Sequence, residues 1–322
     1  MQIRADPDHP DSDSADWLPQ RPGPVFQSAA RPIDPVANLP VERYQPTHLD
    51  RLEAEAIHIL RETAAQFSRP VLLYSAGKDS SVLLRLAQKA FAPAPVPFPL
   101  LHVDTSFKPP ELYAFRDRAV QDAGVRLVVH RNETALAAGA EPHRLGTVRC
   151  CGLLKTQALL EALAAGGFDA AIGGGRRDEE RSRAKERVFS VRDSRGQWDP
   201  RRQRPEVWTL LNGQLAAGET MRVFPLSSWS ELDVWRYVAR ESIPVVSLYF
   251  AFLTTRPDGT TVWMRYRTLG CAPCTGATES TAQSVEEIIS ELVRSEVSER
   301  ALRAIDHDAD GAMERKKQEG YF

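Results

Sequence analysis

The stretch of this sequence with the clearest capacity for chemistry is a turn of small residues that carries one lysine and one aspartate. It runs from Tyr74 to Ser81 and reads Tyr-Ser-Ala-Gly-Lys-Asp-Ser-Ser. An apolar run, 71–74, precedes the turn and apolar residues at helical spacing follow it, which predicts a buried strand, a tight turn and a helix. The N-terminus of such a helix presents backbone N–H groups and the positive end of the helix dipole to an anion. The turn therefore predicts a phosphate-binding loop.

The side chains of this loop suit a nucleotide phosphate. Lys78 supplies a cation, and Asp79 supplies a carboxylate that can hold Mg²⁺ on phosphate oxygens. The other residues that we expect around ATP and pyrophosphate are Ser75, Ala76, Gly77, Ser80 and Ser81. An ordinary turn with a stray lysine is the alternative, but the order and spacing of strand, turn, charges and helix favour phosphate binding.

The loop differs from the common P-loop, because Asp79 follows the Gly-Lys pair and no glycine stands five residues before Gly77. It resembles instead the Ser-Gly-Gly-Lys-Asp-Ser loop of the ATP pyrophosphatase (PP-loop) superfamily, with Ala76 in place of one glycine. This resemblance implies cleavage of ATP between the α- and β-phosphates. AMP is then left on an acceptor and pyrophosphate is released.

Apolar runs along the chain predict the elements that must position this loop. The strands that we expect after the first are 100–103, 126–130, 170–172 and 221–225. Helical segments separate several of them, and the repeated strand–helix units indicate an α/β fold with a doubly wound parallel sheet. Ligands bind beyond the carboxyl ends of the strands in such a sheet. Asp104 and Gly174 follow two of these strands and should lie near the nucleotide; for Asp104, a helix-capping role is the alternative.

A dense run of charged residues, 176–187, follows the triple glycine after the fourth predicted strand. Charged runs are usually solvated helix faces, and that is the alternative here. The position at the carboxyl edge of the sheet favours an anion site instead. Arginine also suits this role, because its guanidinium can bind phosphate or sulfate through two parallel hydrogen bonds.

Size and composition narrow the classes of protein. The chain has 322 residues and a net charge of −2 at pH 7, so no global basic field points to nucleic acid or an anionic membrane. It contains no apolar run of about 18 residues and no signal-peptide core, so we expect a cytoplasmic protein. We divide it into a disordered or loosely attached extension, 1–46, a PP-loop domain, 47–227, and a helical and hairpin region, 228–322.

The four cysteines form two close pairs, Cys150 with Cys151 and Cys271 with Cys274. In a reducing compartment, such pairs favour metal or redox chemistry over disulfides. The second pair falls in the C-terminal region, more than a hundred residues after the first. The fold would therefore have to bring the pairs together for a shared site.

From about residue 47 onward, the chain resembles the small, catalytic subunit of bacterial sulfate adenylyltransferase. The segments that carry the resemblance are 48–55, 75–80, 99–105, 174–187, 198–206, 222–227 and 267–271. The resemblance implies a PP-loop fold and the reaction of ATP with sulfate to give adenosine 5′-phosphosulfate and pyrophosphate. It also implies a hetero-complex with a GTPase large subunit.

The residues fit the chemistry that this resemblance implies. Joining sulfate to the α-phosphate requires neutralisation of two anions and of the leaving pyrophosphate, with little proton transfer. Substrate positioning and electrostatic stabilisation should therefore supply most of the rate enhancement. The catalytic candidates are Lys78, Asp79, Arg177 and Arg183. Arg176 joins the predicted ATP-binding residues, and the three arginines are candidates for the second anion or the transition state.

The cysteines depart from the usual pattern of that family. Their Cys-Cys…Cys-x-x-Cys spacing resembles that of the 4Fe-4S cluster of adenylylsulfate reductases, which belong to the same superfamily, and thiolates are the usual ligands of such clusters. Zinc and four inert cysteines are the alternatives. A reductase itself is disfavoured, because those enzymes carry a nucleophilic cysteine near the C-terminus and no cysteine follows Cys274 here.

The cysteines also raise an alternative function. DNA phosphorothioation uses PP-loop proteins with iron–sulfur clusters, which are thought to activate the DNA backbone as an adenylate. A chain of this kind would work beside a cysteine desulfurase, an ATPase and DNA, with the arginines of 181–204 close to DNA phosphates. The segment 249–267 is also shorter than in the sulfate-activating subunit, which bears on the GTPase partner.

Overall fold

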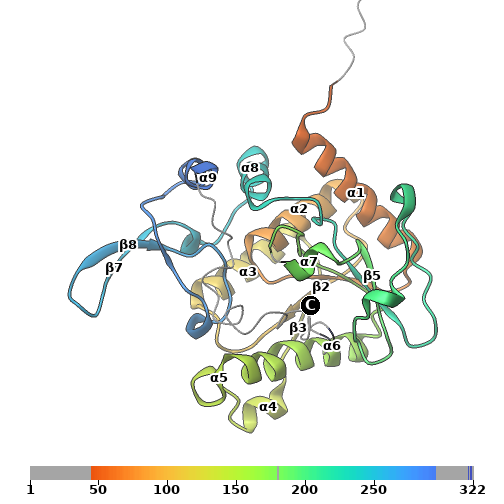
Figure 1. Cartoon of the computed structure of the whole chain (residues 1–322), viewed down its shortest axis with the longest axis horizontal. Coiled ribbons are helices and arrows are strands. Elements are labelled where there is room, and N and C mark those ends of the chain that lie inside the picture. The colour runs from red at the N-terminus through yellow and green to blue at the C-terminus, as the bar shows by residue number, and fades with distance from the viewer. Residues whose placement is uncertain (1–44, 180, 295–317, 319, 321–322) are drawn as a thin grey trace, which may run out of the picture. The chain divides into compact units, whose positions relative to one another are not determined.

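A six-stranded sheet with the order β3-β2-β1-β4-β6-β5 organises the protein (Figure 1). Its strands are β1 (Pro70–Leu73), β2 (Leu100–Val103), β3 (Leu127–His130), β4 (Ala170–Ile172), β5 (Phe189–Arg192) and β6 (Thr220–Val223). Five strands run parallel, and β5 pairs antiparallel with β6 at one edge. The computed structural model describes residues 45–179, 181–294, 318 and 320, so the predicted extension 1–46 lies almost wholly outside it.

Helices cover both faces of the sheet. The long ones are α1 (His48–Gln66), α2 (Lys78–Phe91), α3 (Pro110–Ala123), α6 (Ala158–Gly166) and α8 (Glu231–Glu241). Alternate strand residues point to opposite faces: Leu72 packs with α1, α2 and α8, whereas Val71 packs against α6. Strands buried on both faces must be apolar throughout, which explains the continuous apolar runs of the sequence.

Shorter elements complete the described part of the chain. They are α4 (Glu133–Ala137), α5 (Pro142–Cys151), a π-helical turn (Gly152–Gln157), α7 (Arg181–Ala184), α9 (Val285–Arg294), and a small antiparallel sheet of β7 (Phe252–Thr255), β8 (Thr261–Arg265) and β9 (Thr278–Glu279). Figure 1 shows the β7–β8 hairpin projecting from the body of the structure. No helix among the described residues is long and apolar enough to span a membrane.

The sequence predicted most of the long elements closely, and β5 and α5 are among the elements that it missed. Thr47 and Asp50, three residues apart, predict a capping box at the start of a helix, and α1 has both of its hydrogen bonds. The strands at 100–103 and 170–172 have the predicted bounds. Strand β5 was missed because its segment follows a dense run of charge. Helix α5 was missed as well; Gly146 interrupts it with a φ of 73°, so it lacks a regular apolar face. The fold class is confirmed, with β5 as an antiparallel addition. The sequence also suggests a helix from Ser298, which lies outside the described residues.

An ionic cluster ties α1 to α2 and α8. The Glu53 carboxylate accepts hydrogen bonds from Lys89 Nζ at 2.6 Å, Tyr237 Oη at 2.5 Å and Arg240 Nη2 at 2.5 Å. Burial alone would raise the pKa of Glu53, but the hydrogen bonds from Lys89 and Tyr237 outweigh it and hold the pKa below its usual value. Glu53 therefore links the helices that cover one face of the sheet.

We expect Glu53→Gln to lower the free energy of unfolding by about 1–3 kcal/mol at pH 7, because charge-assisted hydrogen bonds are lost. A lowered pKa means that this stabilisation is full above the unfolded pKa of a glutamate and disappears as the pH falls through the folded value. Urea unfolding of both proteins at several pH values measures the difference. Glu55→Gln, on the exposed side of the same helix, is the control. A difference that does not shrink in acid would contradict this account.

Candidate active site

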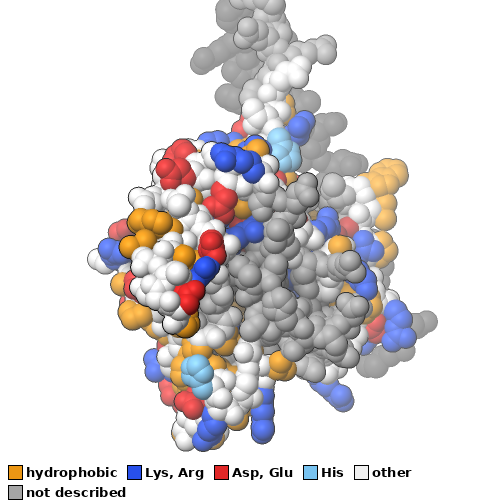
Figure 2. Space-filling view, turned by 60° about the vertical axis from the view of Figure 1, so that its left-hand side comes forward, with side chains coloured by type: hydrophobic (Ala, Val, Ile, Leu, Met, Phe, Trp, Pro, Cys, Tyr) orange, Lys and Arg blue, Asp and Glu red, His pale blue; other side chains and the backbone are white. Residues whose placement is uncertain are grey.

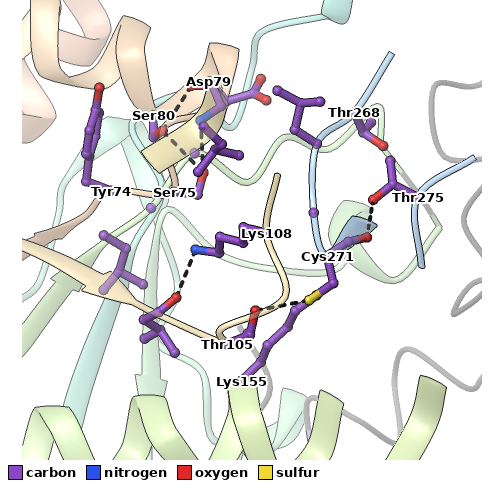
Figure 3. Close-up of a pocket in the computed structure, with 18 of the residues that line it drawn as sticks. Tyr74, Ser75, Asp79, Ser80, Thr105, Lys108, Lys155, Thr268, Cys271 and Thr275 are labelled. Carbon is purple, nitrogen blue, oxygen red and sulfur yellow. Dashed lines mark hydrogen bonds between the residues drawn. The ribbon is translucent and has the colours of Figure 1, made fainter. Parts of the chain in front are cut away.

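A cavity of about 310 Å³ opens at the carboxyl ends of β1, β2 and β4, where the predicted loop lies (Figure 3). Its wall includes Leu73, Val103 and Gly173, each at or just beyond the end of one of these strands. Residues 268–271 and Tyr249, far away in the sequence, close the cavity from the C-terminal region. The described structure therefore places a cavity where a doubly wound sheet is expected to bind its ligand.

The predicted loop forms the first turn of α2 and the connection before it. Ala76 has a φ of 62°, in the left-handed region that favours glycine, which explains why the related loops carry glycine at this point. Ser80 Oγ donates to the Gly77 carbonyl at 3.0 Å and lies 3.2 Å from Ser75 Oγ. Ser75, Gly77 and Ser80 line the cavity with Lys78 and Asp79. Ala76 and Ser81 are buried and lie outside its wall.

Lys78 is held from two distant parts of the chain. Its backbone N–H donates to Tyr249 Oη at 2.9 Å, and its Nζ donates to the Arg267 carbonyl at 3.1 Å. The side chain is 1% exposed, and its ammonium lies 3.6 Å from the Asp79 carboxylate. A buried cation at the N-terminus of a helix is suited to bind a phosphate group.

Asp79 forms an ion pair with Arg176, whose guanidinium is fully buried and also lies 3.1 Å from Asp178. The charge of Arg176 is therefore shared between carboxylates. Gly174 makes this arrangement possible, because a Cβ there would lie 2.9 Å from the Cβ of Asp79. The structure thus gives Arg176 and Gly174 a role in positioning Asp79, while direct ATP contact by these residues stays a prediction.

The other two candidate arginines occupy different surroundings. Arg183 is buried, lines the cavity and lies over the ring of Phe224, with Glu186 at 3.6 Å. Arg177 is exposed and lies outside the cavity wall. Arg183 is therefore the candidate arginine best placed to contact a ligand in the cavity.

Asp104 is buried beneath the cavity and is not part of its wall. It accepts hydrogen bonds from Tyr113 Oη at 2.6 Å and from the Ser106 N–H at 2.8 Å, and Arg131 lies 3.2 Å away. Burial would raise the pKa of Asp104, but these hydrogen bonds outweigh it and hold the pKa low. The geometry favours a structural role in shaping the turn after β2, and nucleotide contact by Asp104 stays a prediction.

Two lysines in the cavity wall, Lys108 and Lys155, were not singled out from the sequence. Each stands four residues after a predicted site residue, Asp104 or Cys151, which was the available signal. Figure 3 shows Lys155 beside Thr105 and Cys271. The Lys108 amine points toward the end of β2, between Ser75 and Thr105. The sequence alone could not show that two separate segments bring these lysines to one cavity.

Lys108 is fixed by a chain of hydrogen bonds. His102 Nδ1 donates to the Tyr74 carbonyl at 2.8 Å, which leaves Nε2 as the acceptor for Lys108 Nζ at 2.9 Å. The Val103 carbonyl accepts a second hydrogen from Nζ at 2.9 Å. Burial, together with the positive charge of Lys155, lowers the pKa of Lys108 to about 7. Burial also lowers the pKa of His102, to about 3, so this imidazole is neutral.

Three of the four cysteines, Cys151, Cys271 and Cys274, line the cavity, and the fourth, Cys150, is buried near them. Cys150 and Cys151 end α5, which packs against the short turn Ala272–Cys274, and Cys271 immediately precedes that turn. Burial and the three other cysteines raise the pKa of Cys150 to about 11. Within the described residues, however, no group of three or more histidine, cysteine, aspartate or glutamate side chains is arranged to hold a metal ion. The predicted pairs are thus close together without forming a preformed coordination site.

The sheet topology and the loop at its carboxyl edge define an ATP pyrophosphatase-type enzyme of the PP-loop class. Residues 69–277 match the phosphoadenosine phosphosulfate reductase domain family. Sulfate adenylyltransferase subunit 2 from Myxococcus xanthus is 60% identical over 298 residues, which cover 86% of this chain and 97% of the relative. The corresponding subunit from Rhodospirillum rubrum is 56% identical, with 85% and 99% covered. Among solved structures, phosphoadenylyl-sulfate reductase from Candida auris aligns with a TM-score of 0.47 and 16% identity, covering 72% of this chain and 98% of its own.

The chain belongs to the sulfate adenylyltransferase subunit 2 family. It is therefore an ATP-using enzyme of the adenylyltransferase type. The resemblance inferred from the sequence is confirmed over most of the chain. The assignment of individual site residues rests on the geometry described above.

We expect the Lys108 amine to titrate near pH 7, because burial and the positive charge of Lys155 both disfavour its protonated form. Its charge should therefore be present below pH 7 and disappear as the pH rises through this value. NMR of protein labelled with ¹³C at lysine Cε measures the midpoint, and the spectrum of Lys108→Met assigns the signal. A midpoint near 10 would contradict the prediction.

Proposed function

We propose that this chain is the catalytic subunit of a sulfate adenylyltransferase, which transfers AMP from ATP to sulfate and releases pyrophosphate. The structural observation that carries the proposal is a single cavity with a phosphate-type loop at one end and two further lysines at the other. The cavity thus offers positive charge for two separate anions. The names of the relatives support sulfate as the acceptor. A cytoplasmic location is part of the same proposal.

The reaction requires little proton transfer from the protein. A sulfate oxygen forms a bond to the α-phosphorus, and the bond from that phosphorus to the oxygen bridging to the β-phosphate breaks, so pyrophosphate leaves with the electron pair. In this proposal, Lys78 and the N–H groups of the α2 N-terminus stabilise the leaving group. Arg183, which lines the cavity, stabilises charge on the transferred phosphoryl group.

Magnesium fits one residue of this site. Asp79 offers carboxylate oxygens in the cavity wall, and such oxygens are the ligands that Mg²⁺ prefers. When bound there, Mg²⁺ would neutralise charge on the phosphates. Arg176 keeps the Asp79 carboxylate directed toward the end of β4, so the residue is positioned in the absence of any ligand.

The relatives are named as subunit 2, which supports assembly of this chain into a hetero-complex with a large subunit. We propose that this partner is a GTPase. Activity should therefore be measured with the chain in its complex, after co-purification of the two subunits.

In that complex, we expect Lys78→Met to reduce sulfate-dependent pyrophosphate release by at least about a hundredfold, because a buried cation at the leaving group is lost. A coupled pyrophosphate assay, with and without sulfate, measures the rate. Arg118→Met, which removes an exposed charge from α3, serves as the control. Pyrophosphate release by Lys78→Met at the wild-type rate would refute the loop assignment, and release that never depends on sulfate would refute the acceptor.

We also propose that the four cysteines bind a 4Fe-4S cluster. The observation in favour is their convergence from α5 and the turn Ala272–Cys274. Four neighbouring thiols repel one another as thiolates, and a bound cation would reverse this effect. Because the thiols are not arranged for coordination, binding would require the two segments to move closer together.

Protein purified without oxygen should contain about four irons and as much acid-labile sulfide per chain, as expected for a 4Fe-4S cluster. Cys150→Ser should lower both values and the visible absorbance. Metal analysis and absorption spectroscopy make the measurement. Zinc alone, or no metal, would contradict the cluster.

Iron in the purified protein would also support the alternative function in DNA phosphorothioation. The relatives reported above are named sulfate adenylyltransferase subunit 2. We therefore prefer sulfate over the DNA backbone as the acceptor. A gene neighbourhood with a cysteine desulfurase and a DNA-binding ATPase, together with sulfur transfer to DNA, would favour the alternative.

A further inference from the structure

The cavity has two chemically different ends. The loop end contains Lys78, Asp79, Glu179 and Arg183, so it carries charges of both signs. Beyond the loop, Lys108 and Lys155 line the cavity from separate segments, with the Lys108 amine at the end of β2 and the Thr105 and Cys271 side chains beside Lys155 (Figure 3). Among the described residues that line the cavity, the only carboxylates are those of the loop end.

The positions of the two lysines are determined by the fold. Lys108 donates to His102 and to the Val103 carbonyl, which takes two of its three ammonium hydrogens and leaves one for a ligand. Lys155 lies in the π-helical turn that continues α5, on the cavity wall. The positive charge of Lys155 acts on Lys108 and disfavours its protonated form, and an anion bound near both would reduce this repulsion.

Other groups at this end suit an oxyanion. The Thr105 hydroxyl lies 3.1 Å from Cys271 Sγ and can rotate to donate to a ligand. Thr147 and Thr156 also line the cavity. An unprotonated dianion such as sulfate has only acceptor oxygens, and hydroxyl and ammonium groups can supply the donors that it needs.

We propose that Lys108 and Lys155 form the subsite that binds the sulfate which accepts AMP. The α-phosphate of ATP, bound by the loop, would then lie between the two ends of the cavity. This inference rests on the proposed function and deepens it, because it names the residues that recognise the acceptor. It also replaces the arginines of 176–187 as the principal sulfate-binding groups and leaves Arg183 for the phosphoryl group.

The test compares two ligands that differ only by the sulfate group, adenosine 5′-phosphosulfate and AMP. Calorimetric titration of the full-length chain should show that Lys155→Met weakens the binding of adenosine 5′-phosphosulfate by roughly tenfold or more, as expected for loss of a charge-assisted hydrogen bond. The affinity for AMP should change less than about twofold. Lys108→Met should give the same pattern, and Arg118→Met should bind both ligands as the wild type does.

Kinetics of the complex give a second readout. In both lysine variants, the KM for sulfate should rise while the KM for ATP stays nearly constant. The proposed subsite would be refuted if the affinities for AMP and adenosine 5′-phosphosulfate fell equally, or if neither affinity changed. A Lys155→Met protein that fails to fold would be replaced by Lys155→Gln.

The controls separate this inference from the proposed function. Wild-type complex that makes no adenosine 5′-phosphosulfate from ATP and sulfate would refute the proposed function. Wild-type complex that makes it, with lysine variants that keep the wild-type KM for sulfate, would refute the subsite alone.

Discussion

The close approach of the first turn of α2 to the end of β4 is the contact on which the site depends. Asp79 meets the backbone at Gly174, where a side chain would collide with it, and its carboxylate pairs with the buried Arg176. Tyr249 and the Arg267 carbonyl hold Lys78 from the C-terminal region. Because these contacts fix the loop before any ligand binds, its charges are preorganised, which is the main way in which a protein stabilises transferring phosphoryl groups.

The same contacts make the C-terminal region part of the active site. Tyr249 and residues 268–271 form one wall of the cavity, although they follow the last strand of the main sheet. This wall also brings Cys271 next to Thr105 and places the turn Ala272–Cys274 on α5. The same segment therefore contributes both to the surroundings of the thiols and to the part of the cavity wall near Lys155.

The sequence predicted a large part of the site because local patterns encode it. Residues 74–81 carry their own strand, turn and helix signals, and their polar residues except Ser81 line the cavity. The arginines of 176–187 were harder to assign, because a charged run has the same composition whether it is solvated, paired or facing a ligand. Only the contacts separate Arg176, paired with Asp79, from Arg183 on the cavity wall and Arg177 outside it.

The sequence by itself determined the fold class, the predicted phosphate loop and the two close pairs of cysteines. Each of these features depends on residues close together along the chain. The tertiary structure decided what fills the rest of the cavity. Lys108 and Lys155 are 47 positions apart in the sequence, and neither belongs to a local motif. Lys108 reaches the cavity wall from the segment after β2, and Lys155 reaches it from the π-helical turn after α5. Local sequence does not encode such long-range packing, because it arises from the burial of apolar faces on separate elements.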